Sequence, residues 1–256
     1  MARAFADTVD PDRGLGEPDI RDPGPDTANY PNSPYTLPRG WNYLETSPVN
    51  LTAGINGRQA EIYNWNYLLR MGITDRVEFR LFGNGLVAAE AGLGKEATSG
   101  FAPLVFDTKI HFWDEHPGHL IPAAGLELYV QTPWGSPAFD QGTLPGATLL
   151  FRNTLPWEIE AEWNVGLAGE QTREGGVRFT DTVQWAFTKG VTERLALFVQ
   201  GYTNQAALPR VGGRTVLGGG MELNLSRRFT IFGAANAGTD QAGPATTYYI
   251  GGAGAF

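Results

Sequence analysis

The chain ends in Tyr248-Tyr-Ile-Gly-Gly-Ala-Gly-Ala-Phe256. Counting back from the terminal aromatic residue, Gly254, Gly252, Ile250 and Tyr248 share one face, because successive side chains of a strand point to opposite faces. A strand that alternates in this way is typical of a bacterial outer-membrane β-barrel, and the terminal Phe suits its closing strand. The stretch predicts that the chain terminus closes a barrel.

The composition supports this fold class and excludes others. The 256 residues include 34 Gly and 17 Pro, which favours strands and turns. No segment approaches the ~20 consecutive apolar residues of a transmembrane helix. The chain has no Cys, which excludes disulfides and thiolate metal sites. A net charge of −8 without a Lys/Arg run argues against nucleic acid as a partner.

Residues 1–40 form a separate region, an acidic N-terminal arm that contains seven Pro. Such a composition buries too little apolar surface to fold alone. We expect one of two arrangements. The arm enters the barrel as a plug, with Asp19, Asp22 or Asp26 meeting lumen Arg residues, or it lies in the periplasm and binds peptidoglycan or an envelope partner. Ala4-Phe-Ala6 fits either the end of a signal peptide or a chance match.

Residues 41–256 are predicted to form one antiparallel transmembrane β-barrel of about twelve strands. Apolar and polar residues alternate along twelve segments, and a period of two places them on opposite faces of a sheet. The predicted strands are 41–53, 59–71, 76–86, 103–113, 120–132, 146–153, 157–168, 177–188, 194–204, 213–225, 228–237 and 246–256.

The connections between these segments alternate between short turns and longer loops, notably 87–102 and 133–145. This is the arrangement of outer-membrane barrels, and an even strand number places both termini on the short-turn, periplasmic side. Aromatic residues near that rim are predicted to form a membrane girdle; they are Tyr67, Phe112, Trp157, Trp185, Phe187, Phe229 and Phe256. The alternative is the core face of a soluble β-sandwich.

Several motifs resemble one family of outer-membrane barrels, named for a putative MetA pathway of phenol degradation and often labelled transporters. Asn32-Ser-Pro-Tyr-Thr-Leu-Pro-Arg-Gly40, with Glu45 after it, resembles its "ESPxTxPxG…E" opening. Residues 68–80, LLRMGITDRVEFR, are similar to its "LLRYGLTDRLELR" hairpin. Residues 123–135 and 191–200 resemble its "ALxLELxLPTG" and "LTDRLSLFVE" strands, and 248–256 resemble its "YYVGxGxxxRF" ending.

This resemblance covers residues 32–256 and implies a barrel of about twelve strands with a role in uptake of hydrophobic or aromatic compounds. The chain departs from the family pattern at three positions. Asn32 replaces a Glu, Gln200 replaces the Glu that closes the "LFVE" strand, and Ala255 replaces the penultimate Arg.

If the apolar face meets lipid, the other face lines the lumen and any substrate path. The predicted lining residues are Glu45, Glu78, Arg80, Asp107, Lys109, His111, Glu127, Tyr129, Arg152, Glu158, Glu160, Glu162, Arg178, Gln200, Arg214 and Glu222. Opposite charges fall on neighbouring strands, so we expect Arg80 to face Asp107 and Lys109 to face Glu127. The lining serves either as a selectivity filter or as a salt-bridge lattice that fills the barrel.

Three functions follow from this interpretation. The first is a passive channel in the bacterial outer membrane for small solutes, with aromatic and hydrophobic compounds as candidates. The second is a structural barrel with a plugged lumen that binds an envelope partner. The third is a lipid hydrolase using His111 with Ser47 or Ser99, which the small inventory of three His and five Ser disfavours.

We expect a non-enzymatic protein with no cofactor and no metal site. The expected partners are the lipid bilayer and a small-molecule solute. The C-terminal strand is expected to meet the barrel-assembly machinery, and an envelope protein or a second copy of the chain is a further candidate partner.

Overall fold

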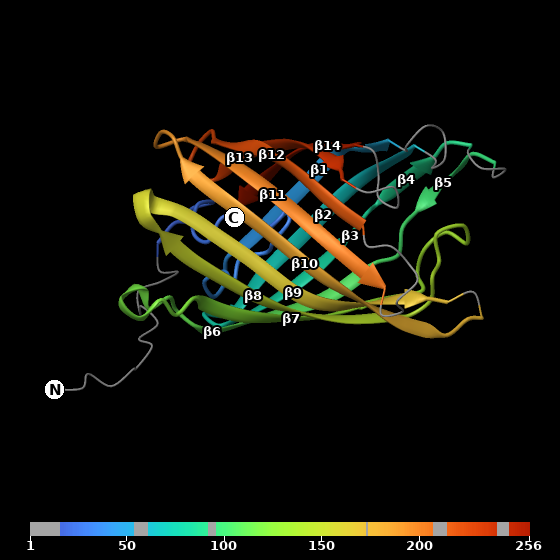
Figure 1. Cartoon of the computed structure of the whole chain (residues 1–256), viewed down its shortest axis with the longest axis horizontal. Coiled ribbons are helices and arrows are strands. Elements are labelled where there is room, and N and C mark those ends of the chain that lie inside the picture. The colour runs from blue at the N-terminus through green and yellow to red at the C-terminus, as the bar shows by residue number, and fades with distance from the viewer. Residues whose placement is uncertain (1–15, 54–60, 92–95, 173, 207–213, 240–245) are drawn as a thin grey trace.

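The computed structural model describes residues 16–53, 61–91, 96–172, 174–206, 214–239 and 246–256. They form a single antiparallel sheet that curls into a tube (Figure 1). The strands are β1 (Asn42–Ala53), β2 (Ile62–Thr74), β3 (Val77–Gly83), β4 (Leu86–Ala89), β5 (Thr98–Phe101), β6 (Val105–Trp113), β7 (Ala123–Gln131), β8 (Leu144–Leu155), β9 (Ile159–Gln171), β10 (Val177–Gly190), β11 (Leu195–Ala206), β12 (Arg214–Asn224), β13 (Phe229–Gly238) and β14 (Thr246–Ala255).

The sheet closes because β1 pairs with β2 on one side and with β14 on the other. Tyr43 lies opposite Ala255, and the backbone N–H of Phe256 donates to Asn42 O at 2.8 Å. Twelve strands form the ring, so the predicted twelve-stranded antiparallel barrel is confirmed, and the closing strand is the one that ends the chain.

The predicted loop 87–102 differs from the structure, since it contains the short hairpin β4–β5. This hairpin pairs with β2 at Ile62–Asn64, beyond the point where β3 ends at Gly83. It extends the barrel wall at the end opposite the short turns (Figure 1).

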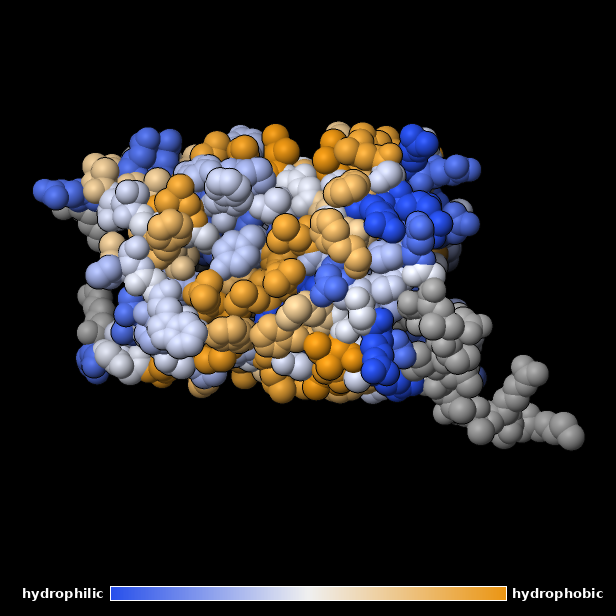
Figure 2. All heavy atoms as spheres, turned by 180° about the vertical axis from the view of Figure 1, so that it is seen from behind, coloured by the Kyte–Doolittle hydropathy of each residue, from blue (hydrophilic) through white to orange (hydrophobic). Residues whose placement is uncertain are grey.

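Alternation along the strands separates a lipid-facing surface from a lumen. In β14, Tyr248 and Ile250 are 48% and 62% exposed, whereas Tyr249 and Ala253 are buried. Figure 2 shows apolar side chains gathered in a band around the middle of the visible face, with hydrophilic residues toward both ends. Apolar outside and polar inside is the pattern of a barrel that spans a membrane.

The register of β1 shifts between Thr46 and Val49 against β14, and between Ser47 and Asn50 against β2. Pro48 lies in both intervals and has no N–H to donate to a ladder, so the strand bulges there. No helix in the described part of the chain is long and apolar enough to cross a membrane; the helical elements are the 3₁₀ turns η1 (Pro117–His119) and η2 (Pro156–Glu158).

The described part of the arm, residues 16–40, lies inside the ring of strands toward the short-turn end (Figure 1). Ile20 and Leu37 are fully buried and belong to one apolar cluster with Tyr43 and Tyr249 of the wall. Two glycines of the wall allow this close approach. A Cβ at Gly72 would lie 2.1 Å from Pro38 O, and one at Gly125 would lie 2.9 Å from Pro34 O.

Candidate functional site: the lumen and its N-terminal arm

A buried ion cluster joins the arm to the barrel wall. The Asp26 carboxylate, at the inner part of the arm, accepts a hydrogen bond from Lys109 Nζ of β6. The guanidinium groups of Arg70 and Arg80 lie 3.4 and 3.5 Å from the same carboxylate oxygen. All four side chains are at most 4% exposed. One arm residue therefore faces three wall cations away from water.

Arg70 of β2 is the most connected cation of this cluster. It donates two hydrogen bonds to Glu78, at 2.7 and 3.0 Å, and one to Glu45 at 3.1 Å. A fourth bond, at 2.8 Å, goes to the backbone carbonyl of Gly24 in the arm. A planar guanidinium suits such multiple recognition, because its five donors form a fixed fork.

A second group of charges surrounds Arg80. Its guanidinium pairs with Glu127 of β7 and lies 3.3 Å from Asp107 of β6. Lys109 Nζ is 3.8 Å from Glu127. The expected facing of Arg80 with Asp107 and of Lys109 with Glu127 thus appears in the structure, with Asp26 of the arm added between them.

The wall also holds the backbone of the arm. The Glu45 carboxylate accepts from the N–H groups of Asp26 and Thr27, at 3.1 and 2.8 Å. Gln200 accepts from the N–H of Tyr30 at 2.8 Å, and Glu78 accepts from that of Leu37 at 2.8 Å. These carboxylates and the amide satisfy backbone donors that would otherwise be buried without partners.

Both ends of the arm lie at the short-turn rim. Ile20 N–H donates to Arg227 O in the β12–β13 turn, and Gly40 N–H donates to Gly72 O near the β2–β3 turn. Between them the chain rises to Tyr30, whose ring packs edge-on against Tyr202 at 4.9 Å. The arm is therefore a loop inserted from the short-turn side.

Asp19 anchors the entry of this loop. Its carboxylate accepts two hydrogen bonds from Arg21, at 2.8 and 2.6 Å, and lies 3.4 Å from Arg227. The hydrogen bonds from Arg21 hold the pKa of Asp19 at about 2. The carboxylate stays ionised at neutral pH. Its partners are Arg21 of the arm and Arg227 of the rim turn, and not the lumen Arg residues expected for a plug contact.

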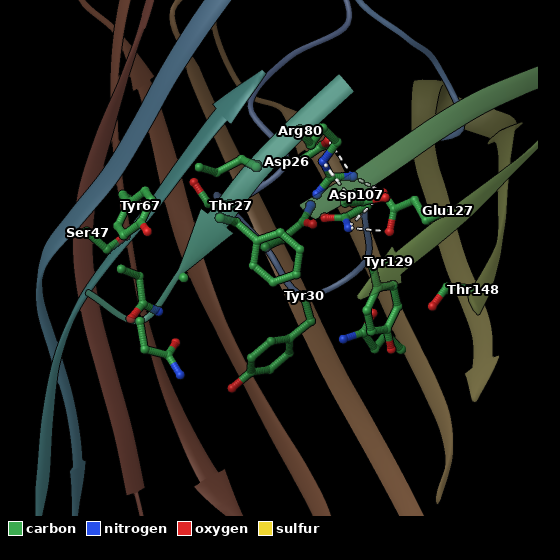
Figure 3. A pocket seen from close by; sticks show the side chains of 18 of the residues that line it. Asp26, Thr27, Tyr30, Ser47, Tyr67, Arg80, Asp107, Glu127, Tyr129 and Thr148 are labelled. Atoms are coloured by element: carbon green, nitrogen blue, oxygen red, sulfur yellow. Dashed lines mark hydrogen bonds and ion pairs between the residues drawn. The ribbon is translucent and has the colours of Figure 1, made fainter. Parts of the chain in front are cut away.

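A cavity of about 440 Å³ lies in the lumen beyond the tip of the arm. Asp26, Thr27 and Tyr30 of the arm border it, together with Asp107 and Tyr129 of the wall (Figure 3). Figure 3 shows the rings of Tyr30 and Tyr129 projecting into this space, with the Arg80 ion cluster to one side. The lumen is thus filled in its short-turn half and hollow in its other half.

Other predicted lining residues lie further from the Asp26 cluster. Arg152 pairs with Glu160 and lies 3.9 Å from Glu162, and Glu222 accepts from Thr230 at 3.3 Å. Arg178 pairs with Glu170 at 2.7 Å, with both side chains more than a third exposed. The side chain of Arg214 lies outside the described residues.

Glu158 does not lie where the alternation predicts it. It belongs to η2 at the short-turn rim, its side chain is 93% exposed, and it pairs with Lys189 at 3.4 Å. Strand β9 begins only at Ile159, because Pro156 starts a 3₁₀ turn and Trp157 and Glu158 both have positive φ. Glu158 therefore does not share a strand face with Glu160 and Glu162 of β9.

Six of the seven predicted girdle residues lie at the short-turn rim or on the outer face of the barrel, and Tyr67 is placed differently. Trp157, Phe187, Phe229 and Phe256 are exposed near the short-turn rim, and Phe112 and Trp185 are half-buried on the outer face. Tyr67 differs, since it lies at mid-height in β2 opposite Gly83 and borders both the lumen cavity and a groove on the outer wall. Strand β3 ends at Gly83, and the Tyr67 ring therefore borders a space on the lumen side and another on the outer side.

His111, the proposed base of a hydrolase, is bound on both ring nitrogens. Nδ1 is 3.1 Å from Pro34 O of the arm, Nε2 is 3.2 Å from Asp114, and the ring stacks on Tyr35. His111 is therefore a contact between the wall and the arm. Among the described residues, no group of three or more His, Asp or Glu is placed to hold a metal ion.

Sequence comparison assigns this arrangement to a family. The model of the family described as "Putative MetA-pathway of phenol degradation" matches residues 26–255. The chain belongs to this family. The match begins at Asp26, inside the arm, so the family model includes both the inner part of the arm and the barrel. No curated protein sequence matches the chain.

Solved structures of low sequence identity share the fold. The COG4313 outer membrane channel from Pseudomonas putida F1 is 14% identical, with a TM-score of 0.62 over 88% of this chain and 99% of that one. The NanC porin is 7% identical, with a TM-score of 0.55 over 83% and 98%. The translocator domain of the autotransporter NalP from Neisseria meningitidis is 10% identical, with a TM-score of 0.51 over 85% and 88%.

Proposed function

We propose that the chain is a passive channel of the bacterial outer membrane for small solutes, with aromatic and hydrophobic compounds as candidates. The observation that carries this proposal is a closed barrel whose outside is apolar and whose inside keeps a cavity of about 440 Å³. The family description, which names a phenol pathway, supports aromatic compounds as solutes. We place the short-turn rim and both chain ends in the periplasm, as in other barrels with this loop arrangement.

In this proposal the arm is a plug that closes the periplasmic half of the lumen. Its backbone is bound by Glu45, Glu78 and Gln200, and Asp26 faces three cations. A second candidate function rests on the same contacts: a barrel permanently filled by its arm, whose rim binds an envelope partner. The strand β14, which ends in the exposed Phe256, is the proposed contact for the barrel-assembly machinery.

Single-channel conductance in a planar bilayer separates these functions. We compare the full chain with a variant lacking residues 1–38, after checking by circular dichroism that the variant is folded. A channel plugged by its arm gives small or intermittent currents as the full chain and larger, steady currents after deletion. Absence of current in both proteins would overturn the channel proposal and favour the filled barrel.

The charge balance of the lumen predicts the selectivity of the deletion variant. The described lumen then keeps five basic side chains against eight acidic ones, which are Arg70, Arg80, Lys109, Arg152 and Arg178 against Glu45, Glu78, Asp107, Glu127, Glu160, Glu162, Glu170 and Glu222. Rings of acidic side chains favour cations in a pore. We expect cations to carry most of the current, and the reversal potential in a KCl gradient measures this.

A further inference from the structure

The hollow half of the lumen has a lining unlike that of a hydrocarbon site. Five amide side chains of the wall border the cavity; they are Asn50, Asn66, Asn84, Gln184 and Asn204. None of the five makes a side-chain hydrogen bond to another described residue, and Asn66 Oδ1 is buried without a partner there. Apart from this Asn66 oxygen, which has almost no accessible surface, the amide groups are available to a solute.

Tyrosines supply the remaining surface. Tyr30 of the arm and Tyr129 of β7 project their rings into the cavity (Figure 3), and Tyr67 and Tyr249 also border it. Ring faces pack against flat or ring-shaped solutes, while each amide has both N–H donors and an acceptor oxygen in the same side chain. A hydroxyl group also donates and accepts, so amides and hydroxyls complement each other.

The floor of the cavity adds a charge requirement. Asp26, Asp107 and Glu127 border it together with a single cation, Arg80. Asp107 Oδ1 and Arg80 Nε are buried without hydrogen-bond partners among the described residues. These two atoms lie beneath the surface of the floor, and Arg80 Nε is 3.3 Å from the other Asp107 oxygen. The carboxylates of the floor repel an anion, and a bare hydrocarbon leaves the amides of the lining without partners.

We propose that this cavity binds an uncharged six-membered ring that carries two or more hydroxyl groups. The inference deepens the proposed function, because it names the class of solute that the channel admits. The volume of about 440 Å³ lies within the roughly 300–1,000 Å³ of small-molecule sites. Hydroxylated arenes and sugars share this chemistry, and the test below distinguishes the two sources.

The test is ligand-detected saturation-transfer NMR on the full chain in detergent micelles. The hydroxylated probes are catechol and D-glucose, and each has a matched control: toluene lacks the hydroxyls of catechol, and D-glucuronate adds a negative charge to the glucose ring. We expect saturable binding of one or both hydroxylated probes. Binding of catechol alone identifies arenes, and binding of glucose alone identifies sugars.

Substitutions tie the signal to the cavity. Gln184→Leu removes an amide from the lining, and we expect about threefold to tenfold weaker binding, the effect of one lost hydrogen bond. Val183→Ala is the matched control. Val183 precedes Gln184 in β10 but faces the lipid and is 42% exposed. We expect this substitution to leave binding unchanged. Asn66→Leu repeats the test from β2 in case Gln184→Leu does not fold.

Two results overturn the inference: hydroxylated probes that bind no better than toluene and glucuronate, or binding that folded Gln184→Leu and Asn66→Leu leave unchanged. Binding is measured without a gradient across a membrane. A failure to bind the hydroxylated probes is therefore distinguishable from a failure of the protein to conduct. A protein that conducts in bilayers but binds no hydroxylated ring keeps the proposed function and loses this inference.

Discussion

The two halves of the lumen handle polar groups in opposite ways. Around Asp26, in the short-turn half, charged side chains are buried and satisfy one another and the arm backbone. Beyond Tyr30, in the other half, neutral amides line an open cavity whose floor is formed by the charged cluster. The comparison shows that the lumen is filled where the arm occupies it and hollow where the arm ends.

The physical reason is the cost of buried charge. A carboxylate or guanidinium removed from water needs partners with good geometry, so the filled half concentrates pairs such as Arg70 with Glu78. Amides have a smaller desolvation cost and tolerate exchange between water and a solute. Each prediction below tests whether this division between the halves is correct.

The largest effect is expected from Asp26→Ala in the filled half. Lys109 then loses its hydrogen-bonded carboxylate, and the next one, Glu127, is 3.8 Å away. We expect the arm to be destabilised by about 3 kcal/mol, the lower part of the range for breaking a buried ion pair. Hydrogen exchange of the arm amides in detergent measures the change.

The control for this variant is Asp19→Ala at the rim, where the partners Arg21 and Arg227 are half or more exposed. Exposed pairs contribute about 0–1 kcal/mol, so this variant changes exchange little. Equal effects of the two substitutions would contradict the view that the interior of the filled half, and not its rim, retains the arm.

A smaller effect is expected at the boundary between the halves, from Gln200→Leu. Gln200 is fully buried, accepts from Tyr30 N–H and donates to Asn236 Oδ1 at 2.8 Å. Its loss leaves both groups unsatisfied, and we expect about 2 kcal/mol lower stability of the arm tip. The measurement is hydrogen exchange at Tyr30.

Gln200→Glu sharpens this result, because the family pattern has Glu at the position. A Glu keeps the acceptor for Tyr30 N–H and loses the amide donor to Asn236. We expect protection of the Tyr30 amide to stay closer to the unsubstituted level than in Gln200→Leu. Equal loss in both variants would show that the donor to Asn236, and not the acceptor for the arm, fixes the boundary.

The smallest effect is expected in the open half, from Arg178→Ala. The pair of Arg178 with Glu170 is formed between β10 and β9, with both side chains 38–39% exposed. Its removal lowers the free energy of unfolding by about 0–1 kcal/mol. Urea unfolding followed by Trp fluorescence checks this, and a loss as large as that of Asp26→Ala would remove the distinction between the halves.

Much of the barrel was predictable from local sequence. A strand such as β9 alternates in hydrophobicity from Ile159 to Leu167, and the period of two assigns each side chain to a face. The same rule places Arg70 on the lumen face with Leu68. Arg70 is nevertheless not among the predicted lining residues, because it stands between Leu69 and Met71 in an apolar stretch. Its spacing of two residues from Leu68 in β2 was the signal that would have identified it.

Local rules fail where the chain leaves regular geometry. Glu158 follows the alternation of β9 but lies in a turn that Pro156 starts, and Tyr67 is placed by the early end of β3. The turn at Pro156 and the end of β3 do not repeat along the chain, so a pattern of alternating residues does not reveal them. The hairpin β4–β5 is similar, since its four-residue strands are too short to show an alternation.

The sequence by itself determined the class of the fold, the number of strands in the ring, their two faces and the closing role of the final residues, because these follow from interactions between neighbours along a strand. Only the tertiary structure decided that the arm enters the lumen and that Asp26 is its central contact. Asp26 and Lys109 are 83 positions apart. Their meeting depends on barrel closure and on the space left by Gly72 and Gly125, which no local pattern encodes.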